Sequence, residues 1–318
     1  KLQCFQRACE KCEEAIKMDP SYAIAWINWG SALNQCGNRT EDVEEKLRCF
    51  QQACEKCEKA IWIDEDLTMA WINRGIALAS YGEQTNDFEE KLRCFQQACE
   101  KFEEVTKIDP SFAIAWVDWG ITLVAHGNAT NDVEESRQCF KEACEKFEEA
   151  TKIAPSDAFV WDSWGSALVE YGERTNDIEE TQQCFQDACE KYEEATKIDP
   201  DLARAWFNWG YALIDCGKRL YDVEESHQCF QDACEKFEEV TKIEPDYPIS
   251  WINWGYALIR CGKRARDLEK KLQCFQDACK KCKKAIEIDF SNVTAWMNWA
   301  SALSEYGERI KDVAESRQ

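Results

Sequence analysis

The chain has 318 residues, with 61 acidic against 39 basic side chains and a formal net charge of −22 at pH 7. So acidic a chain is a poor match for DNA, RNA or an anionic membrane as the main partner, because binding to those surfaces requires a basic footprint. No apolar run in the sequence approaches the ~20 residues that a membrane-spanning helix needs.

A short sequence motif recurs at a fixed interval. Cys-Phe pairs recur every 45 residues, beginning at Cys4, Cys49, Cys94, Cys139, Cys184, Cys229 and Cys274. A fixed period of this size indicates a solenoid of structural repeats. We expect a partial repeat over residues 1–20, full repeats over 21–65, 66–110, 111–155, 156–200, 201–245 and 246–290, and a partial repeat over 291–318. Both ends fall within a helical pattern and lack a polar capping repeat, so we expect a segment of a longer array.

The first helix of each repeat is predicted from the stretch that follows its opening residues. In the repeat 21–65, Pro20 and Ser21 are expected to open the helix, with Ser21 as the N-cap. Gly37 is expected to end it as a left-handed C-cap. At about 100° per residue, one face of this helix carries Trp26, Trp29, Gly30 and Leu33. Because Gly30 lacks a Cβ atom, we expect this face to approach another helix closely.

The second helix of each repeat is predicted to begin after an aspartate that holds the same position in every period. These N-cap candidates are Asp42, Asp87, Asp132, Asp177, Asp222, Asp267 and Asp312. Glu44 and Glu45 follow the first of them, and acidic residues in a first turn complement the helix dipole. The helix should run to about Ile63, and its expected buried stripe is Val43, Leu47, Phe50, Cys54, Cys57 and Ile61.

Together the two helices resemble the tetratricopeptide repeat, a helix–turn–helix unit of about 34 residues. The family's first-helix positions match Trp26, Trp29, Gly30 and Leu33, and those of its second helix match Ala53, Cys57, Ala60 and Glu65, with proline instead of Glu65 in most other repeats. The extra residues of this period lie between Gly37 and Ala53, where most of them should lengthen the second helix. The resemblance covers the whole chain. It implies an all-α solenoid, a right-handed superhelix of antiparallel helix pairs that binds proteins or peptides.

The cysteines raise the question of a metal or redox site, since Cys54 and Cys57 form a C-x-x-C. The Cys57 position reads Cys12, Cys57, Phe102, Phe147, Tyr192, Phe237 and Cys282 along the chain, which indicates a core position. Within one helix Cys49 and Cys54 point about 140° apart, which suits neither a disulfide nor a shared metal. We therefore predict buried, reduced thiols. The sequence leaves open that cysteines of neighbouring repeats meet, and then oxidise or bind a soft metal.

No catalytic residue, metal site or cofactor is predicted. His126 and His227 do not recur at their positions in other repeats, and no nucleophile–base pair or phosphate-binding glycine loop recurs either. We therefore expect a protein without enzyme activity. The twenty cysteines stand beside ample apolar residues for a core, which favours a reducing, cytoplasmic location, while an extracellular one stays open.

The other face of the first helix is the candidate binding site. By the resemblance it lines a concave groove, and across the repeats it is apolar with a recurring asparagine, whose amide can pair with a peptide backbone. The candidate peptide-binding residues are Asn28, Asn73, Asn208, Asn253, Asn298, Ile72, Ile114, Ile121, Phe207, Tyr211, Ile252 and Tyr256. The alternative is that neighbouring helices bury these apolar side chains against one another.

Two further interpretations concern association of whole chains. Near-identical repeats would also suit a structural, self-assembling array or filament. Residues 260–286 carry ten basic against three acidic side chains, so one basic band interrupts an acidic solenoid. That band is either a docking patch for an acidic partner, including another copy of this chain, or a solvated face that pairs with acidic neighbours.

Overall fold

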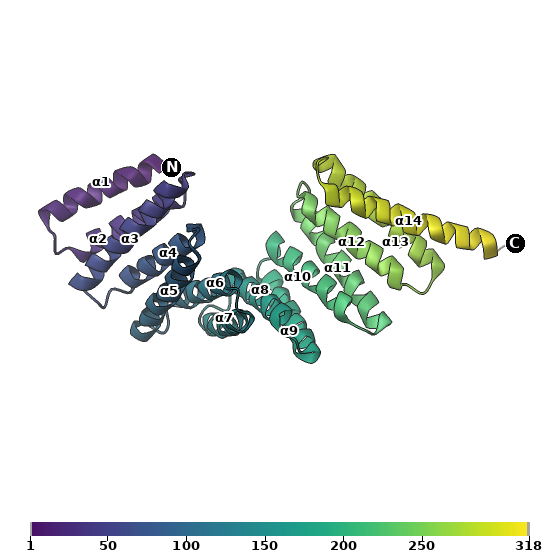
Figure 1. Ribbon diagram of the computed structural model, residues 1–318, viewed down its shortest axis with the longest axis horizontal. Coiled ribbons are helices and arrows are strands. Elements are labelled where there is room, and N and C mark those ends of the chain that lie inside the picture. The colour runs from purple at the N-terminus through teal and green to yellow at the C-terminus, as the bar shows by residue number, and fades with distance from the viewer. Residues whose placement is uncertain (1, 317–318) are drawn as a thin grey trace. The chain divides into compact units, whose positions relative to one another are not determined.

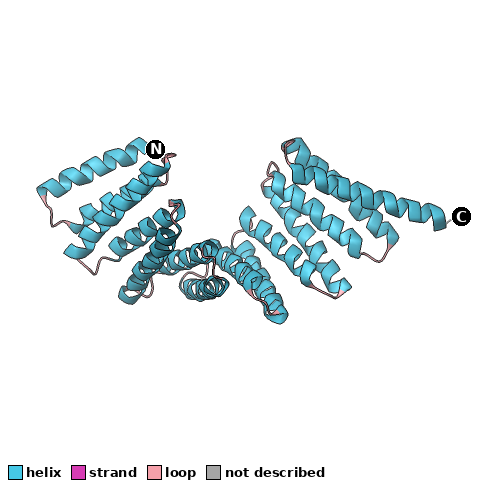
Figure 2. Ribbon diagram, in the orientation of Figure 1, coloured by secondary structure: helices cyan, strands magenta, loops and turns pink. Residues whose placement is uncertain are grey.

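The computed structural model describes the backbone of residues 2–316 and the side chains of residues 2–311. This backbone forms fourteen helices and no strand (Figures 1 and 2). In chain order they are α1 (Leu2–Met18), α2 (Ala23–Gly37), α3 (Val43–Ile63), α4 (Thr68–Gln84), α5 (Phe88–Ile108), α6 (Ala113–Ala129), α7 (Val133–Ile153), α8 (Ala158–Arg174), α9 (Ile178–Ile198), α10 (Ala203–Arg219), α11 (Val223–Ile243), α12 (Pro248–Arg264), α13 (Leu268–Ile288) and α14 (Val293–Ser316).

The helices divide between two compact units, Lys1–Ser156 with α1 to α7 and Asp157–Gln318 with α8 to α14. Within the first unit, α2 packs on α3, α4 on α5 and α6 on α7, and each pair also contacts the next. The second unit repeats this arrangement with α8 and α9, α10 and α11, and α12 and α13, followed by α14. Each unit is therefore a stack of antiparallel helix pairs, and the predicted all-α solenoid is confirmed.

The aspartate caps of the second helices are confirmed at six positions. In each case the carboxylate accepts a hydrogen bond from a backbone N–H of the first turn, as in the 2.8 Å bond from Glu45 N to Asp42 Oδ1. The six caps are Asp42, Asp87, Asp132, Asp177, Asp222 and Asp267. A charge-assisted cap satisfies a backbone donor that the helix itself cannot pair.

The seventh predicted cap is wrong, because α14 is a single helix whose backbone runs through Asp312. In the other repeats, side chains such as Phe50, Ala53 and Cys57 hold the second helix back against the first. Residues 312–316 include no equivalent of these core positions. Without that packing, local helix propensity continues the first helix in its own direction.

Both predicted ends of the first helix also need correction. α2 begins at Ala23 after Tyr22, which makes no side-chain cap, while the backbone N–H and hydroxyl of Ser21 both donate to Asp19 in a turn. Gly37 is the last residue of the right-handed helix, and no described glycine has a positive φ. A Cβ atom at Gly37 would come within 2.6 Å of the Phe50 ring, so this glycine permits close packing instead of a left-handed cap.

The core lies between the paired helices and follows one line along each second helix. In α3 this line is Phe50, Ala53, Cys57 and Ala60, all at most 2 % exposed. Gly30 faces it as predicted, since a Cβ atom there would lie 2.4 Å from the Cys57 sulfur. The predicted stripe was displaced by one residue at two points, because Ala53 and Ala60 are buried in place of Cys54 and Ile61. Val43, at the solvated helix start, is exposed.

The tryptophans of the first helix lie at the edge of this core. Trp26 stacks on Trp29 with ring centroids 6.0 Å apart, and the Lys56 ammonium lies 4.4 Å from the Trp29 ring. The Trp26 indole donates to the carbonyl of Pro20 at 2.9 Å. The same bond recurs in most repeats, from Trp71, Trp116, Trp206, Trp251 and Trp296. These indoles tie each first helix to the turn that precedes it.

Candidate binding face of the first helices

The face of each first helix turned away from its second helix forms the candidate site, which we call the first-helix face. In α2 it comprises Ile24, Asn28, Ser31 and Gln35, spaced four, three and four residues apart on one side of the helix. The glycine side of the helix is committed to the core. Successive first helices contact one another within each unit, so the first-helix face continues from repeat to repeat there.

An exposed apolar side chain recurs at the start of this face. The position of Ile24 holds large apolar side chains that are 41–56 % exposed in five repeats: Ile24, Met69, Ile114, Phe159 and Ile249. Met69 and Phe159 were missed by reasoning from the sequence, although their place in the period equals that of Ile24. Regularly repeated exposure of large apolar groups is the property expected of an interaction site.

The predicted apolar site residues fall into two groups. Ile114, Ile121 and Tyr211 are exposed, whereas Phe207 and Tyr256 are half-buried. Ile72 and Ile252 are instead buried between repeats. Ile72 packs against Val105 and Ala115, and Ile252 packs against Ala285, Ile286 and Ala295. At these two positions, neighbouring helices bury the face, which is the alternative that the sequence left open.

Most of the predicted asparagines make contacts between repeats. The Asn208 amide donates to Asp162 Oδ1 at 3.0 Å, and the Asn298 amide donates to the Ile252 carbonyl at 3.4 Å. Asn73 is buried, and its backbone carbonyl accepts from the side chain of Asn34. Among the described residues, no hydrogen-bond partner reaches the amides of Asn28 and Asn253, so these two can serve a ligand.

Asp118 replaces the asparagine in α6 and changes the charge of the face. Burial raises the pKa of its carboxyl to about 6 from an ordinary 3.8. No cation among the described side chains lies within ion-pair distance. The exposed Ile114 and Ile121 lie four residues before it and three after it, on the same side of the helix. The three side chains offer apolar surface around a carboxylate without a partner.

In the second unit, α8, α9 and α10 enclose a cavity of about 310 Å³ on this face. Three predicted site residues, Phe207, Asn208 and Tyr211, line it together. Glu170 and Glu173 line it too and pair with Arg174, and burial together with neighbouring acidic groups raises the pKa of Glu173. Apolar side chains and two carboxylates therefore share the lining of this cavity.

The cysteines occupy the helix interfaces. Cys57 and Cys282 are fully buried, which confirms the predicted core position, and burial raises the pKa of half-buried Cys54 to about 12. The thiols of Cys216 and Cys229 lie 4.0 Å apart between α10 and α11, the two helices of one repeat. Among the described side chains, no group of three or more His, Cys, Asp and Glu residues is arranged to hold a metal ion.

Most charges of the basic band over residues 260–286 have local partners. Lys263 pairs with Glu305 at 2.8 Å, and Arg266 pairs with Glu224 at 3.5 Å. The Lys281 ammonium lies 3.3 Å from the centre of the Trp254 ring. These contacts favour the solvated face over a docking patch, and self-association stays a prediction.

Comparison with known proteins agrees with this architecture. The model of the family described as the plant-specific mitochondrial import receptor subunit TOM20 matches residues 1–114, 90–205 and 152–250. No curated protein matches the chain. None of the described helices combines the length and apolarity that crossing a membrane requires.

Two solved structures share the fold. One is the C-terminal part of a tetratricopeptide-repeat protein from Cytophaga hutchinsonii, which is 11 % identical, covers 92 % of this chain and 94 % of its own, and has a TM-score of 0.59. The other is YrrB, a tetratricopeptide-repeat protein with an unusual peptide-binding site, which is 19 % identical, covers 77 % of this chain and 97 % of its own, and has a TM-score of 0.50. At these identities the likeness establishes the tetratricopeptide-repeat fold.

Proposed function

We infer that this chain, which belongs to the family of the plant-specific mitochondrial import receptor subunit TOM20, binds a segment of another polypeptide along its first-helix face. The fold and the family are those of a protein–protein interaction scaffold, and we assign the chain no catalytic step. The observation that carries the finer proposal is the row of exposed apolar side chains at Ile24, Met69 and Ile114 within the first unit. A row that recurs with the period of the fold suits an extended or helical ligand that crosses several repeats.

The charges of the face favour a ligand that is basic as well as apolar. Asp118 stands without a cation between Ile114 and Ile121. Glu170 and Glu173, which line the cavity with Tyr211, share a single cation, Arg174, at 3.3 and 3.6 Å. A lysine or arginine of the ligand would satisfy Asp118, while its apolar neighbours cover the isoleucines. The overall charge of −22 would speed the encounter with such a segment and make it sensitive to salt.

Fluorescence anisotropy tests this proposal with a labelled amphipathic peptide of leucine, alanine and arginine, and with a twin in which glutamate replaces every arginine. The whole chain should bind the arginine peptide and not its twin. The double variant Ile114→Ser, Ile121→Ser should bind about tenfold more weakly, because two apolar contacts are lost. Tyr211→Ala should weaken binding in the same direction.

Val133→Ser provides the matched control, since Val133 is an equally exposed apolar residue of the same unit at the start of a second helix. It should leave the affinity unchanged. Equal binding of the two peptides, or equal weakening by the control, would show that the first-helix face is not the binding surface.

A further inference from the structure

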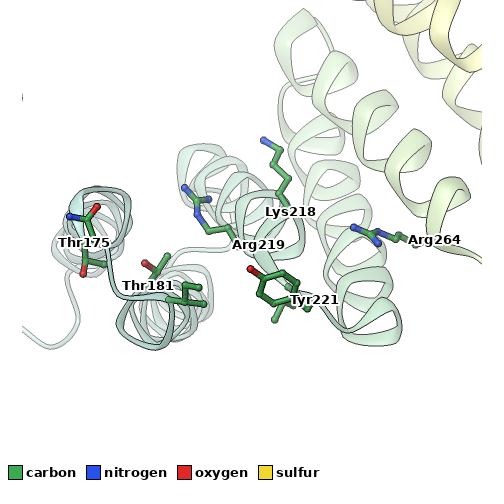
Figure 3. A pocket seen from close by; sticks show the side chains of 9 residues that line it. Thr175, Thr181, Lys218, Arg219, Tyr221 and Arg264 are labelled. Carbon is green, nitrogen blue, oxygen red and sulfur yellow. The ribbon is translucent and has the colours of Figure 1, made fainter.

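A second hollow in the unit Asp157–Gln318 lies away from the first-helix face, at the turns between helices. Its volume is about 650 Å³. The turn from α8 to α9 forms one side, and the turn from α10 to α11 and the end of α12 form the other. Figure 3 shows its lining, which includes Thr175, Asn176, Lys218, Arg219, Tyr221 and Arg264.

The charge of this lining is opposite to that of the chain. Three cationic side chains line the hollow and no carboxylate does, although the chain holds 61 acidic residues. Lys218 and Arg219, the last two residues of α10, hold the positions that Asn38 and Arg39 hold in the repeat 21–65. The end of α12 adds Arg264, one period after Arg219. Cations of two neighbouring repeats therefore line one hollow.

The two arginines are available to a ligand. Lys218 is neutralised, because its ammonium pairs with Asp215 at 2.7 Å. Arg219 is held in place without an ion pair: its guanidinium donates to the Asp215 carbonyl oxygen at 3.2 Å and lies 4.9 Å from the centre of the Phe185 ring. The carboxylate of Glu173 also acts on Arg219 from beyond ion-pair distance.

Arg264 is half-buried, and among the described residues no carboxylate lies within 4.0 Å of its guanidinium. Partly buried guanidinium groups ordinarily have an anionic partner, because removal from water without one is costly. Arg264 fits this description, whereas Arg219 is exposed. The hollow therefore joins one half-buried guanidinium that lacks an anion to a second one that a ligand can reach from solvent.

We propose that this hollow binds a phosphorylated serine or threonine of a partner polypeptide. A phosphate dianion matches two planar guanidinium forks better than a single carboxylate does, because it offers three strong acceptor oxygens and nearly two charges. The Asn176 amide and the exposed Tyr221 hydroxyl are further donors at the same rim. Ile178 and Leu220 supply apolar surface for the residue next to the phosphate.

This site goes beyond the first-helix face, and either can fail without the other. The test uses the whole chain and three pools of labelled peptides. Within each pool the peptide sequences are random except for one fixed pair of adjacent residues. The pools carry phosphoserine–leucine, serine–leucine or glutamate–leucine, and inorganic phosphate is added as a competitor. Wild-type protein should bind the phosphoserine pool about tenfold more tightly than either of the other pools. Inorganic phosphate should compete only weakly, because it lacks the peptide contacts.

The double variant Arg219→Glu, Arg264→Glu should lose this preference while keeping the circular dichroism and melting temperature of the wild type. The single variant Arg264→Gln removes one fork without adding a charge and should weaken binding several-fold. Arg39→Glu is the matched control, since Arg39 holds the position of Arg219 four repeats earlier and lies outside the hollow. It should bind as the wild type does, and so should Ile114→Ser, Ile121→Ser.

Four results would overturn the proposal. They are equal affinity for the serine pool, equal affinity for the glutamate pool, retained preference in the double arginine variant, and inorganic phosphate binding as tightly as the peptides. Loss of phosphopeptide binding in Ile114→Ser, Ile121→Ser would also overturn it, because the peptides would then sit on the first-helix face.

Discussion

Asp118→Asn should stabilise the protein at neutral pH, although it removes a charge that can serve the ligand. The substitution installs the residue that five other repeats carry at this position, as in Asn28 and Asn253. In the wild type the carboxylate is half-buried without a cation, and burial raises its pKa from 3.8 to about 6. Asparagine fills nearly the same volume and carries no charge to desolvate.

The size and the pH dependence of the effect follow from that pKa. A tenfold change in the ionisation equilibrium corresponds to about 1.4 kcal/mol, so the ionised carboxylate costs about 2 to 3 kcal/mol of stability. Below the unfolded-state pKa, near 4, Asp118 is neutral in both states, and the variant gains little. Between about pH 4 and 6 the folded state holds the extra proton, so wild-type stability falls as the pH rises. Above pH 6 the variant is more stable than the wild type by the full difference of about 2 to 3 kcal/mol.

Hydrogen exchange read by mass spectrometry measures this difference locally, because each repeat contacts only its neighbours. At pH 7.5 the amides of α6 should exchange up to about a hundredfold more slowly in the variant than in the wild type. At pH 4.5 the difference should shrink to about sixfold, because the carboxyl is then ionised mainly in the unfolded state. The reverse change, Asn253→Asp, should weaken the protection of α12 at pH 7.5.

Equal hydrogen-exchange protection of α6 in the variant and the wild type at pH 7.5 would refute the claim that the ionised Asp118 carboxylate destabilises this helix. A gain at pH 4.5 as large as that at pH 7.5 would also refute it, since the effect would then come from packing and not from charge.

Three other predictions concern the core. Gly120→Ala should destabilise the protein by about 1–3 kcal/mol in urea unfolding, because the new Cβ atom would lie 2.8 Å from a phenylalanine ring. In the control Gly307→Ala, the new Cβ atom meets nothing within 4 Å, so this variant should be as stable as the wild type or more stable. Trp119→Ala should cost about 3 kcal/mol through lost packing, and a loss below 1 kcal/mol would place this indole in solvent. Native thiol labelling should be fast at the exposed Cys4 and slow at the buried Cys57 until the protein is denatured, and rapid reaction of both would contradict the packing.

Local sequence signals were enough to predict the helices and their order. The period, the aspartate caps and the glycine at Gly30 act over one turn or one repeat, so their effects can be worked out without knowing the neighbours. Asp42 caps α3 as predicted, and Gly30 lies against Cys57 as predicted. The resemblance to tetratricopeptide repeats then predicted that these helices pack in pairs into an all-α solenoid.

Only the tertiary structure decided which side chains of the first-helix face remain exposed. Helical periodicity gives the direction in which a side chain points from the helix axis. Whether that side chain is buried depends on how closely the next helix packs. Ile72, at the position of Ile27, is buried against Val105 and Ala115, whereas Ile114, at the position of Ile24, is exposed, although both were predicted to face a groove. Asn208 donates to a carboxylate of the preceding repeat. Arg219 and Arg264, 45 residues apart, line one hollow because neighbouring turns stack, and no window of the sequence contains that contact.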